Sequence, residues 1–355
     1  MIEVKIKSSE KNYPIFIENE AIADLREKIF SSINGRNYLV VISQKVEKLY
    51  GKILKIPKTN KFVLKDGEKE KTFKNYKKIL EHALKLKLTR KSVIVAIGGG
   101  VVGDLAGFAA STYMRGIDFI QVPTTLLACV DSSVGGKTAI DTNFGKNLVG
   151  TFYQPKAVYI NPKFLKTLDD KQFKSGLGEV VKYSFIEKSC QCEVDYNLTN
   201  FLTEKFSEIL SRDEKTLAKL IEICINLKKS VVEKDEKESN LRQILNFGHT
   251  YAHAIEKITN YKKYTHGEAV VVGIEFAFNL ALKKNLIDKN YKFFADDVIK
   301  NFNFQQIRQY KLDKIAEIML MDKKSDGKEI TFILPSDYSV VKSLNITPDE
   351  IIAYQ

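Results

Sequence analysis

The strongest constraint on the fold is an apolar run that leads into a glycine-rich turn. Residues 93–97 are Val, Ile, Val, Ala and Ile, which indicates a strand buried inside a sheet. Gly98, Gly100 and Gly103 follow with the spacing G-x-G-x-x-G, and a helical pattern starts at Asp104. Glycines at this spacing let backbone N–H groups approach a phosphate at the start of a helix. The turn therefore either holds a nucleotide or only serves packing.

The remaining periodicity predicts two different halves. Before residue 165, apolar runs at 38–42, 62–64 and 119–122 alternate with helical stretches such as 72–88, which is typical of a parallel sheet covered by helices. After it, helical spacing dominates, at 198–210, 214–233, 246–259 and 267–284, and residues 330–334 and 338–341 predict a hairpin. We expect an α/β protein with an N-terminal Rossmann-like parallel-sheet domain (1–165), a mainly α-helical C-terminal domain (166–355) and the active site in the cleft between them.

Composition excludes several classes of protein. Apolar residues make up 44% and charged residues 28% of the 355 residues, an ordinary globular balance. No run reaches the roughly 18 uncharged apolar residues that would span a bilayer, and the first residues lack the apolar core of a signal peptide. We therefore expect a cytoplasmic protein with no membrane partner. The four cysteines are expected to be free thiols in a reducing compartment.

The net charge of +12 argues for a small anionic partner rather than nucleic acid. Arginine, the usual residue for bidentate contacts to bases and phosphates, supplies only seven of the 56 basic residues. The lysines are scattered along the chain, as on a solvated surface. We expect no nucleic-acid partner, and a net field that favours a small anionic substrate.

A second glycine segment resembles the end of a phosphate-binding P-loop. Gly136, Lys137 and Thr138 match that end, but Asp131 stands where the motif requires a glycine, which argues against an ATPase. The same segment still offers Lys137, Lys146 and Asn147 among glycines, a chemistry suited to phosphates and hydroxyl groups.

Three of the four histidines fall within eighteen residues and predict a metal site. His249 and His253 are four residues apart and share one face of a predicted helix, and His266 opens the next helix. Clustered imidazoles completed by a carboxylate can bind zinc and leave a coordination position open. The spacing alone would make both His249 and His253 ligands. It leaves the carboxylate open among three candidates, which are Glu179, Glu256 and Glu268.

Taken together, these motifs resemble the 3-dehydroquinate synthases, members of the sugar-phosphate cyclase superfamily. The resemblance covers nearly the whole chain, and so many segments in one order make it specific. It is carried by residues 98–104, 113–116, 121–127, 130–138, 145–147, 178–183, 241–242, 245–250 and 266–269. One departure is that residues 141–143 read Asp-Thr-Asn where many members have Asn-His-Pro.

The resemblance implies an NAD- and metal-dependent phosphorus-oxygen lyase of the shikimate pathway. Members convert 3-deoxy-D-arabino-heptulosonate 7-phosphate to 3-dehydroquinate and phosphate. The steps are transient oxidation by NAD, phosphate elimination, re-reduction, ring opening and aldol closure. NAD would bind to the N-terminal domain, and the substrate and a zinc or cobalt ion to the C-terminal domain. A homodimer is implied as well.

The resemblance also implies a role for individual residues. It implies that Glu179, His249 and His266 are the metal ligands, and that His253 is an acid/base or phosphate-contacting residue rather than a ligand. The implied catalytic residues are His253, Glu238, Lys137, Arg242 and Asn246. The implied substrate contacts are Arg115 (from the dimer partner), Asp131, Lys137, Asn147, Lys182, Lys228, Arg242, Asn246, His253 and one or both of Lys323 and Lys324. The implied NAD contacts are Asp66, Gly67, Glu68, Lys69, Glu70, Lys71, Gly100, Val101, Val102, Gly103, Asp104, Thr124, Thr125, Lys137, Lys146, Phe164, Leu165, Lys166 and Thr167.

Three other functions remain as alternatives. The nearest is another sugar-phosphate cyclase, such as a 2-deoxy-scyllo-inosose synthase, which would use a different sugar. A metal-dependent polyol dehydrogenase would release NADH instead of recycling it. A non-catalytic phosphate-binding module would bind its ligand without consuming it.

Overall fold

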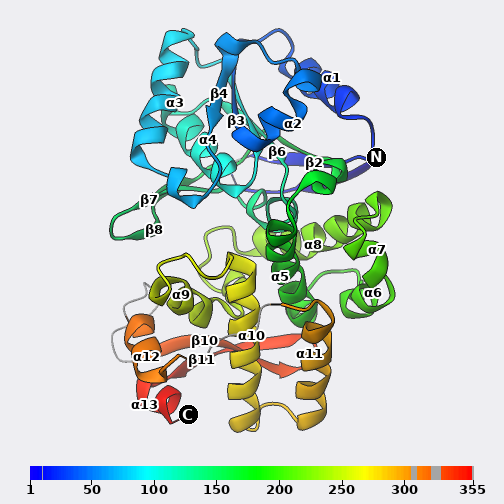
Figure 1. The fold of residues 1–355 in the computed structure, drawn as a ribbon, viewed down its shortest axis with the longest axis vertical. Coiled ribbons are helices and arrows are strands. Elements are labelled where there is room, and N and C mark those ends of the chain that lie inside the picture. The colour runs from blue at the N-terminus through cyan, green and yellow to red at the C-terminus, as the bar shows by residue number, and fades with distance from the viewer. Residues whose placement is uncertain (10, 305–309, 321–328, 354–355) are drawn as a thin grey trace. The chain divides into compact units, whose positions relative to one another are not determined.

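The computed structural model describes residues 1–353 except 10, 305–309 and 321–328. The chain forms two compact units (Figure 1). The first consists of Met1–Leu168 and Leu210–Ile225, and the second of Asp169–Ile209 and Asn226–Gln355. The division into domains 1–165 and 166–355 stays a prediction.

The first unit is built on a seven-stranded sheet. Its strand order is β1-β2-β9-β6-β5-β3-β4, and every pairing is parallel except that of β1 with β2. The strands are β1 (Ile2–Ile6), β2 (Tyr13–Ile17), β3 (Tyr38–Ser43), β4 (Lys61–Leu64), β5 (Val93–Gly98), β6 (Asp118–Pro123) and β9 (Ala157–Ile160). The helices and helical turns are α1 (Ile22–Ile33), α2 (Gln44–Leu54), η1 (Lys58–Asn60), η2 (Glu68–Glu70), α3 (Phe73–Lys85), α4 (Gly100–Thr112), η3 (Tyr113–Arg115), η4 (Ala128–Ser132) and η5 (Pro162–Thr167).

Helices cover both faces of this sheet, as the continuous apolar run predicts. In β5, Ile94 and Ala96 pack into the core under α3 and α4, whereas Val93, Val95 and Ile97 pack into the core under α1 and α2. Successive side chains of a strand point to opposite faces, so a strand buried on both sides must be apolar throughout. The predicted central strands and the parallel sheet are confirmed.

The glycine-rich turn connects β5 directly to α4, also as predicted. One detail differs, because α4 begins at Gly100 rather than at Asp104. Gly98 and Gly107 are needed for packing: a Cβ on Gly98 would lie 2.6 Å from Val102, and one on Gly107 would lie 2.5 Å from Thr138. Gly99 is the N-cap and provides no side chain, so the N-terminus of α4 is not blocked by a capping side chain.

A small antiparallel hairpin that the apolar pattern did not indicate also belongs to the first unit. Its strands are β7 (Lys137–Thr142) and β8 (Gly145–Phe152). Much of β8 is exposed, and Phe144 at the tip is 94% exposed. A strand without a continuous apolar face gives little signal in a hydrophobicity pattern.

The second unit is mainly helical and contains one hairpin, as predicted. Its elements are α5 (Asp170–Ile186), η6 (Lys188–Cys190), α6 (Leu198–Glu204), α7 (Phe206–Leu210), α8 (Glu214–Lys234), η7 (Leu241–Asn246), α9 (His249–Ile258), α10 (His266–Lys283), α11 (Lys289–Asn301), α12 (Leu312–Leu320), β10 (Ile330–Asp337), β11 (Val340–Ile346) and α13 (Pro348–Ile352). The last residue of α7, Leu210, and the first part of α8 group with the first unit. The helical spacing at 198–210 is confirmed, and the segment forms two helices that are separated at Lys205.

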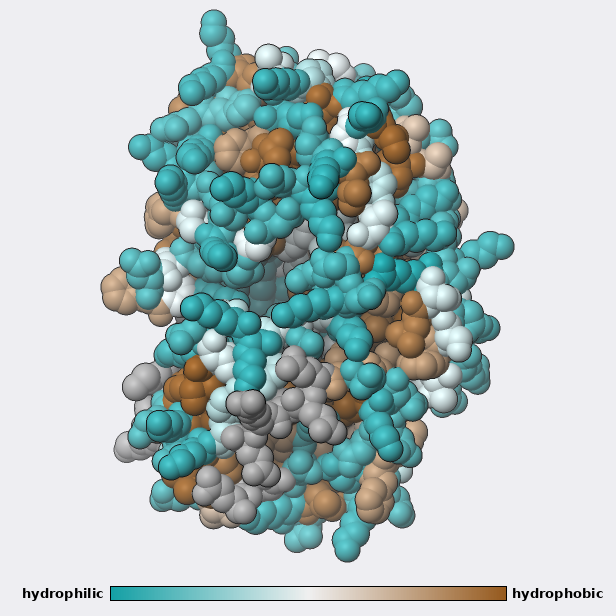
Figure 2. Space-filling model, in the orientation of Figure 1, coloured by the Kyte–Doolittle hydropathy of each residue, from teal (hydrophilic) through white to brown (hydrophobic). Residues whose placement is uncertain are grey.

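Hydrophilic side chains cover most of the face shown in Figure 2. Among the helices in the described part of the chain, none is long and apolar enough to cross a membrane.

Candidate active site

Three side chains from different helices of the second unit meet at one point. Glu179 lies in the middle of α5, His249 begins α9 and His266 begins α10. Each offers one ligand atom, and these atoms lie within 4.8 Å of one another. The structure thus brings together the three residues that the family resemblance implies as metal ligands.

Both imidazoles present the same nitrogen to the carboxylate. Nε2 of His249 lies 3.4 Å and Nε2 of His266 lies 3.3 Å from Oε1 of Glu179. The other nitrogens face acceptors: Nδ1 of His249 lies 3.1 Å from the carbonyl oxygen of Phe247, and Nδ1 of His266 lies 3.5 Å from Oε1 of Glu256. An acceptor at Nδ1 holds the proton there and leaves the Nε2 lone pair for a metal, the usual arrangement around histidine ligands.

Close glycine contacts set the positions of these helices. Gly267, next to His266, packs so tightly on α5 that an added Cβ would lie 1.8 Å from the carbonyl oxygen of Ser175. An added Cβ on Gly273 of α10 would lie 1.8 Å from the carbonyl oxygen of Gly248, next to His249. Gly178, which precedes Glu179, meets the backbone of Gly267. Each of the three ligand candidates therefore adjoins a glycine that lets two segments of backbone approach.

Burial and charge keep Glu179 ionised. Its side chain is 1% exposed, and Nζ of Lys182 lies 2.5 Å from Oε2. Burial would raise the pKa of Glu179, but the ammonium group of Lys182 outweighs burial and holds the pKa well below its usual value. Burial lowers the pKa of His249 to about 4, so this ring is neutral at pH 7.

His266 differs from His249 because it faces two carboxylates. Burial would lower its pKa, but contacts with Glu179 and Glu256 outweigh burial and raise the pKa to about 10. A proton on His266 occupies the place that a cation would take, and a bound divalent ion would displace it.

The donor set fits a divalent metal. Neither carboxylate oxygen of Glu179 accepts a well-formed hydrogen bond from any described residue, although both are buried. Buried carboxylates are normally hydrogen-bonded or coordinated, and direct coordination to a cation would add to the charge balance that Lys182 and the two imidazoles provide. Two imidazoles and one carboxylate are the three-ligand set of catalytic zinc sites that keep a position open.

The spacing of the residues left three candidates for the carboxylate, and their positions in the structure distinguish them. Glu256 faces Nδ1 of His266, on the side of the ring away from Glu179. Glu268 forms a capping box with Thr265 at the start of α10, where its side chain accepts from the Thr265 N–H at 2.7 Å. Glu179 alone of the three belongs to the group of converging ligand atoms.

The third of the clustered histidines, His253, lies beside the three converging side chains. The ring of His253 is 5.6 Å from that of His249 and 6.4 Å from that of His266, between centroids. It is not among the converging ligand atoms, so the spacing argument that made it a ligand finds no support in the geometry.

Other predicted residues of the second unit gather in and around η7. Nδ2 of Asn246 donates to Oε1 of Glu238 at 2.7 Å, and Arg242, 1% exposed, donates from Nη1 to the carbonyl oxygen of Glu236. Lys182 and Lys228 are buried cations at 2% and 5% exposure. Lys323 and Lys324 lie outside the described residues.

The sequence analysis did not single out Asp235, whose carboxylate holds the turn between α8 and η7. Its carboxylate accepts hydrogen bonds from the backbone N–H groups of Ser239, Asn240 and Arg242 at 2.7–2.9 Å. Burial would raise the pKa of Asp235, but these N–H donors outweigh it and lower the pKa to about 2. An aspartate shortly before a turn is a known sequence signal for such side-chain-to-backbone bonds.

In the first unit, several predicted NAD residues and the predicted substrate residue Asn147 lie around the start of α4. Nζ of Lys71 lies 2.5 Å from Oδ2 of Asp104 and donates to Oδ1 of Asn147. Thr124 donates its N–H to the carbonyl oxygen of Gly98, which places residues 124 and 125 beside the glycine turn. These residues come from four separate segments of the chain.

The remaining predicted residues of the first unit lie in varied surroundings. Phe164 and Leu165 bury their side chains in the core at 2% and 0% exposure, so only their backbone is available to a ligand. Lys137 and Arg115 are exposed, and Arg115 has a φ of 65°. Asp131 is the second-last residue of η4, and Lys146 lies in β8.

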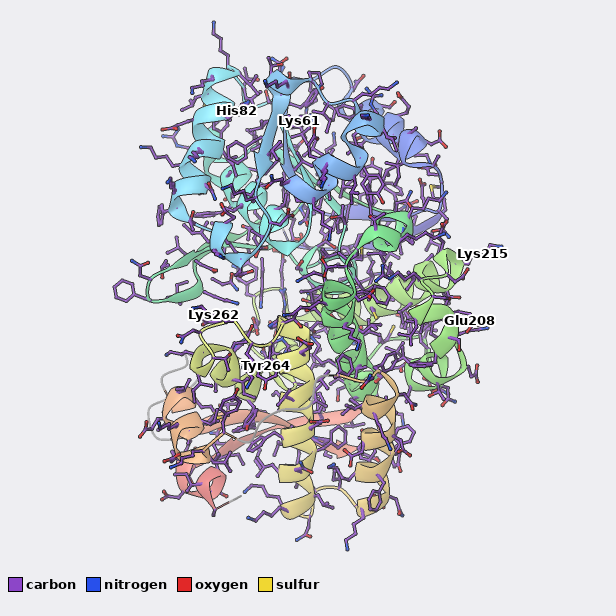
Figure 3. The ribbon with its side chains drawn as sticks, viewed as in Figure 1. Lys61, His82, Glu208, Lys215, Lys262 and Tyr264 are labelled. Carbon is purple, nitrogen blue, oxygen red and sulfur yellow. The ribbon has the colours of Figure 1, made fainter. Side chains whose placement is uncertain are left out.

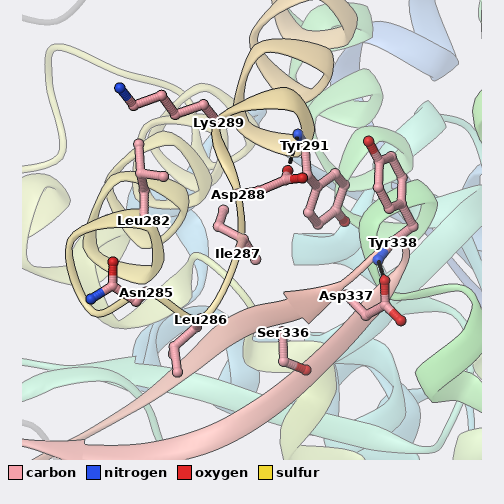
Figure 4. Close-up of a pocket in the computed structure, with 10 residues that line it drawn as sticks. All are labelled: Leu282, Asn285, Leu286, Ile287, Asp288, Lys289, Tyr291, Ser336, Asp337 and Tyr338. Atoms are coloured by element: carbon pink, nitrogen blue, oxygen red, sulfur yellow. Dashed lines mark hydrogen bonds between the residues drawn. The ribbon is translucent and has the colours of Figure 1, made fainter.

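Two further features lie apart from the predicted site. The fourth histidine, His82, is on α3 (Figure 3), with Nε2 2.7 Å from the carbonyl oxygen of Thr59. A cavity of about 670 Å³ in the second unit (Figure 4) contains none of the predicted site residues. It is lined by Leu282, Asn285, Leu286, Ile287, Asp288, Lys289, Tyr291, Ser336, Asp337 and Tyr338.

Known proteins similar to this chain share its whole length. The chain is 40% identical to the 3-dehydroquinate synthase of Alkaliphilus metalliredigens, covering 100% of this chain and 98% of the relative. It is also 40% identical to that of Campylobacter jejuni strain RM1221, covering 99% and 98%.

Solved structures of related enzymes have the same fold. A 2-deoxy-scyllo-inosose synthase complexed with carbaglucose-6-phosphate, NAD⁺ and Co²⁺ matches with a TM-score of 0.84 and 26% identity, covering 99% of this chain and 98% of that one. The 2-epi-5-epi-valiolone synthase of Streptomyces hygroscopicus, with NAD⁺ and Zn²⁺ bound, matches the fold with a TM-score of 0.86 at 23% identity, covering 98% and 97%.

Family models give the assignment. The model of the 3-dehydroquinate synthase N-terminal region matches residues 61–175, and that of the C-terminal region matches residues 176–325. With relatives at 40% identity over the full chain, the chain belongs to the 3-dehydroquinate synthase family.

Proposed function

We propose that this chain is a 3-dehydroquinate synthase of the shikimate pathway. It would convert 3-deoxy-D-arabino-heptulosonate 7-phosphate to 3-dehydroquinate and phosphate. Family membership supports this activity, and the observation that carries it is the approach of two histidine Nε2 atoms to one buried carboxylate. NAD is regenerated in each turnover, so the enzyme would be a phosphorus-oxygen lyase rather than an oxidoreductase.

Glu179, His249 and His266 would hold a zinc or cobalt ion. The N-terminus of α4, the loop at 66–71, Thr124 and Thr125 would hold NAD, because backbone N–H groups at a helix start bind phosphates. When bound, the metal would polarise substrate hydroxyl groups and the nicotinamide would accept a hydride and return it.

Buried cations would bind the anionic substrate. Lys182, Lys228 and Arg242 have side chains that are at most 5% exposed. Burying a cation is costly unless it is compensated, and anionic substrate groups would add to the compensation that the protein already provides. Lys137, exposed at the start of β7, would add a contact to the substrate and to NAD.

Polar residues beside the histidine cluster would move protons. The hydrogen bond from Asn246 to Glu238 fixes the orientation of both side chains, with the carboxylate as acceptor. His253 lies on the same helix face as His249 and is half-buried, so it would exchange protons with the substrate while His249 binds the metal. Fixed groups of this kind contribute to rate mainly by holding the substrate in one orientation.

The proposal includes a cytoplasmic homodimer. Arg115 is exposed and would reach the substrate phosphate of the partner subunit. Sedimentation of the purified chain would give twice the monomer mass of 40.4 kDa if this is correct.

A product assay tests the function. The purified chain is incubated with the heptulosonate phosphate, NAD and zinc, and released phosphate and 3-dehydroquinate are measured together. We expect equal amounts of both, no net NADH, and loss of activity on chelation that zinc or cobalt restores. A His82→Ala variant is the matched control, because this histidine lies outside the cluster, and it should retain activity.

The alternatives give different results in the same assay. Consumption of glucose 6-phosphate in place of the heptulosonate would identify an inosose synthase. Steady growth of NADH with a simple polyol would identify a dehydrogenase. Either result would overturn the proposed activity.

A further inference from the structure

Lys71 is a buried cation that joins three segments of the first unit. Its side chain is 4% exposed and follows η2, the turn after β4. Nζ lies 2.5 Å from Oδ2 of Asp104 in α4 and 4.0 Å from Oε1 of Glu68. Burial would lower the pKa of Lys71, but Asp104 and Glu68 outweigh burial and raise it. The ammonium group therefore stays charged and acts only as a donor.

The same lysine holds both strands of the β7–β8 hairpin. Its carbonyl oxygen accepts the N–H of Asp141 in β7 at 2.8 Å, and its Nζ donates to Oδ1 of Asn147 in β8. Oδ1 of Asp141 in turn accepts the N–H of Asn147 at 3.0 Å. Asn147 has a φ of 56°, a left-handed conformation that these bonds help to fix.

These contacts determine which end of the Asn147 amide is offered to a ligand. An ammonium group cannot accept a hydrogen bond, so the amide must turn its oxygen toward Lys71. The NH₂ group then points away from Lys71, and the residue is exposed. Asn147 consequently offers hydrogen-bond donors, which suit the hydroxyl and phosphate oxygens of a sugar phosphate.

We propose that Lys71 is a positioning residue that fixes Asn147 as a hydrogen-bond donor to the anionic sugar-phosphate substrate, and thereby links the loop at 66–71 to substrate binding. This inference rests on the proposed function. It adds that a residue expected to contact NAD acts on the substrate through a second side chain. Removing the lysine should then weaken substrate binding even when NAD is saturating.

A double-mutant cycle tests the link. KM for the heptulosonate phosphate is measured at saturating NAD for Lys71→Met, Asn147→Ala and the double variant. Each single change should raise KM by about tenfold, the effect of one lost hydrogen bond to a charged group. The double variant should show the same tenfold rise, because Lys71 acts through Asn147. A hundredfold rise in the double variant would overturn the inference.

Two further variants keep the test independent of folding. Asn147→Asp still accepts from Lys71 but has no NH₂ donor, so its KM should rise at least as much as that of Asn147→Ala; an unchanged KM would overturn the inference. Lys77→Met is the matched control, because Lys77 is a 77% exposed lysine with a single ion pair to Glu81, and its KM should equal that of the unmodified chain. Absence of turnover in the unmodified chain would contradict the proposed function, whereas turnover with additive effects would contradict this inference alone.

Discussion

The two units each bury a charged group, but they compensate it differently. Lys71 in the first unit is fully supplied with partners by the protein, from Asp104, Glu68 and Asn147. Glu179 in the second unit has Lys182 and two imidazoles nearby, yet neither of its oxygens accepts a well-formed hydrogen bond from a described residue. We call these two groups of residues the Lys71 centre and the Glu179 centre. The hydrogen-bonding needs of the Lys71 centre are met by the protein, so we call it complete, whereas the Glu179 centre is incomplete and arranged for a cation.

Under the proposed function, this difference would let the two units serve different parts of one reaction. The Lys71 centre holds the loop at 66–71 and the β7–β8 hairpin near the start of α4, which would favour a rigid binding site for a cofactor. The Glu179 centre buries an anionic group without well-formed hydrogen bonds, which costs stability, and a bound cation would offset that cost.

Removing a histidine from the incomplete centre should have the largest effect. His249→Ala should lower the zinc content from about one ion per chain to less than about a tenth, because only two protein ligands remain. His253→Ala is the matched control on the same helix face, and it should keep its zinc while losing turnover. Metal analysis of both purified variants decides this, and full zinc content in His249→Ala would refute the ligand assignment.

Substituting a glycine whose close contact positions the Glu179 centre should have the second-largest effect. Gly267→Ala places a Cβ 1.8 Å from the carbonyl oxygen of Ser175 and should cost about 2–3 kcal/mol of unfolding free energy. Gly51→Ala in α2 is the control, because its Cβ meets only the flexible end of Glu47. Glu47, whose carboxylate pairs with Lys61, must shift to make room, so this control should change the free energy of unfolding by less than about 1 kcal/mol. Urea unfolding measures both, and equal stabilities would show that the helix contact is not tight.

Asp235 is a carboxylate whose hydrogen bonds all come from the protein, and we expect its substitution to have the smallest effect of the three. Asp235 has a pKa of about 2, below the value of about 3.9 in an unfolded chain, so its contribution is present above about pH 5 and is lost as the pH falls toward 2. We expect Asp235→Asn to lose about 1–2 kcal/mol at pH 7 and to approach the unmodified chain near pH 2.5. Urea unfolding at both pH values tests this, and an unchanged gap at low pH would contradict the assigned cause.

The sequence predicted those parts of the fold that depend on apolar periodicity. The run at 93–97 became a strand buried on both faces, and the glycines after it became the turn into α4. The β7–β8 hairpin was not predicted, because its exposed strand has no apolar face. The break at Lys205 was also missed, since apolar spacing continues across it.

The site was only partly predictable from residue spacing. Clustering found the histidines, but it could not separate Glu179 from Glu256 and Glu268, which lie closer in sequence to the histidines. That choice depends on how α5 crosses α10 through Gly178 and Gly267, a contact between segments about 90 residues apart. The resemblance to a known family supplied Glu179 before the geometry did.

The central claim is that Glu179, His249 and His266 together hold one divalent cation. Anomalous diffraction from crystals of the cobalt-loaded chain tests it most directly. The claim predicts one strong peak about 2.0–2.2 Å from Nε2 of both histidines and from a carboxylate oxygen of Glu179. A peak at other side chains, or no peak in a chain that contains cobalt by metal analysis, would contradict it.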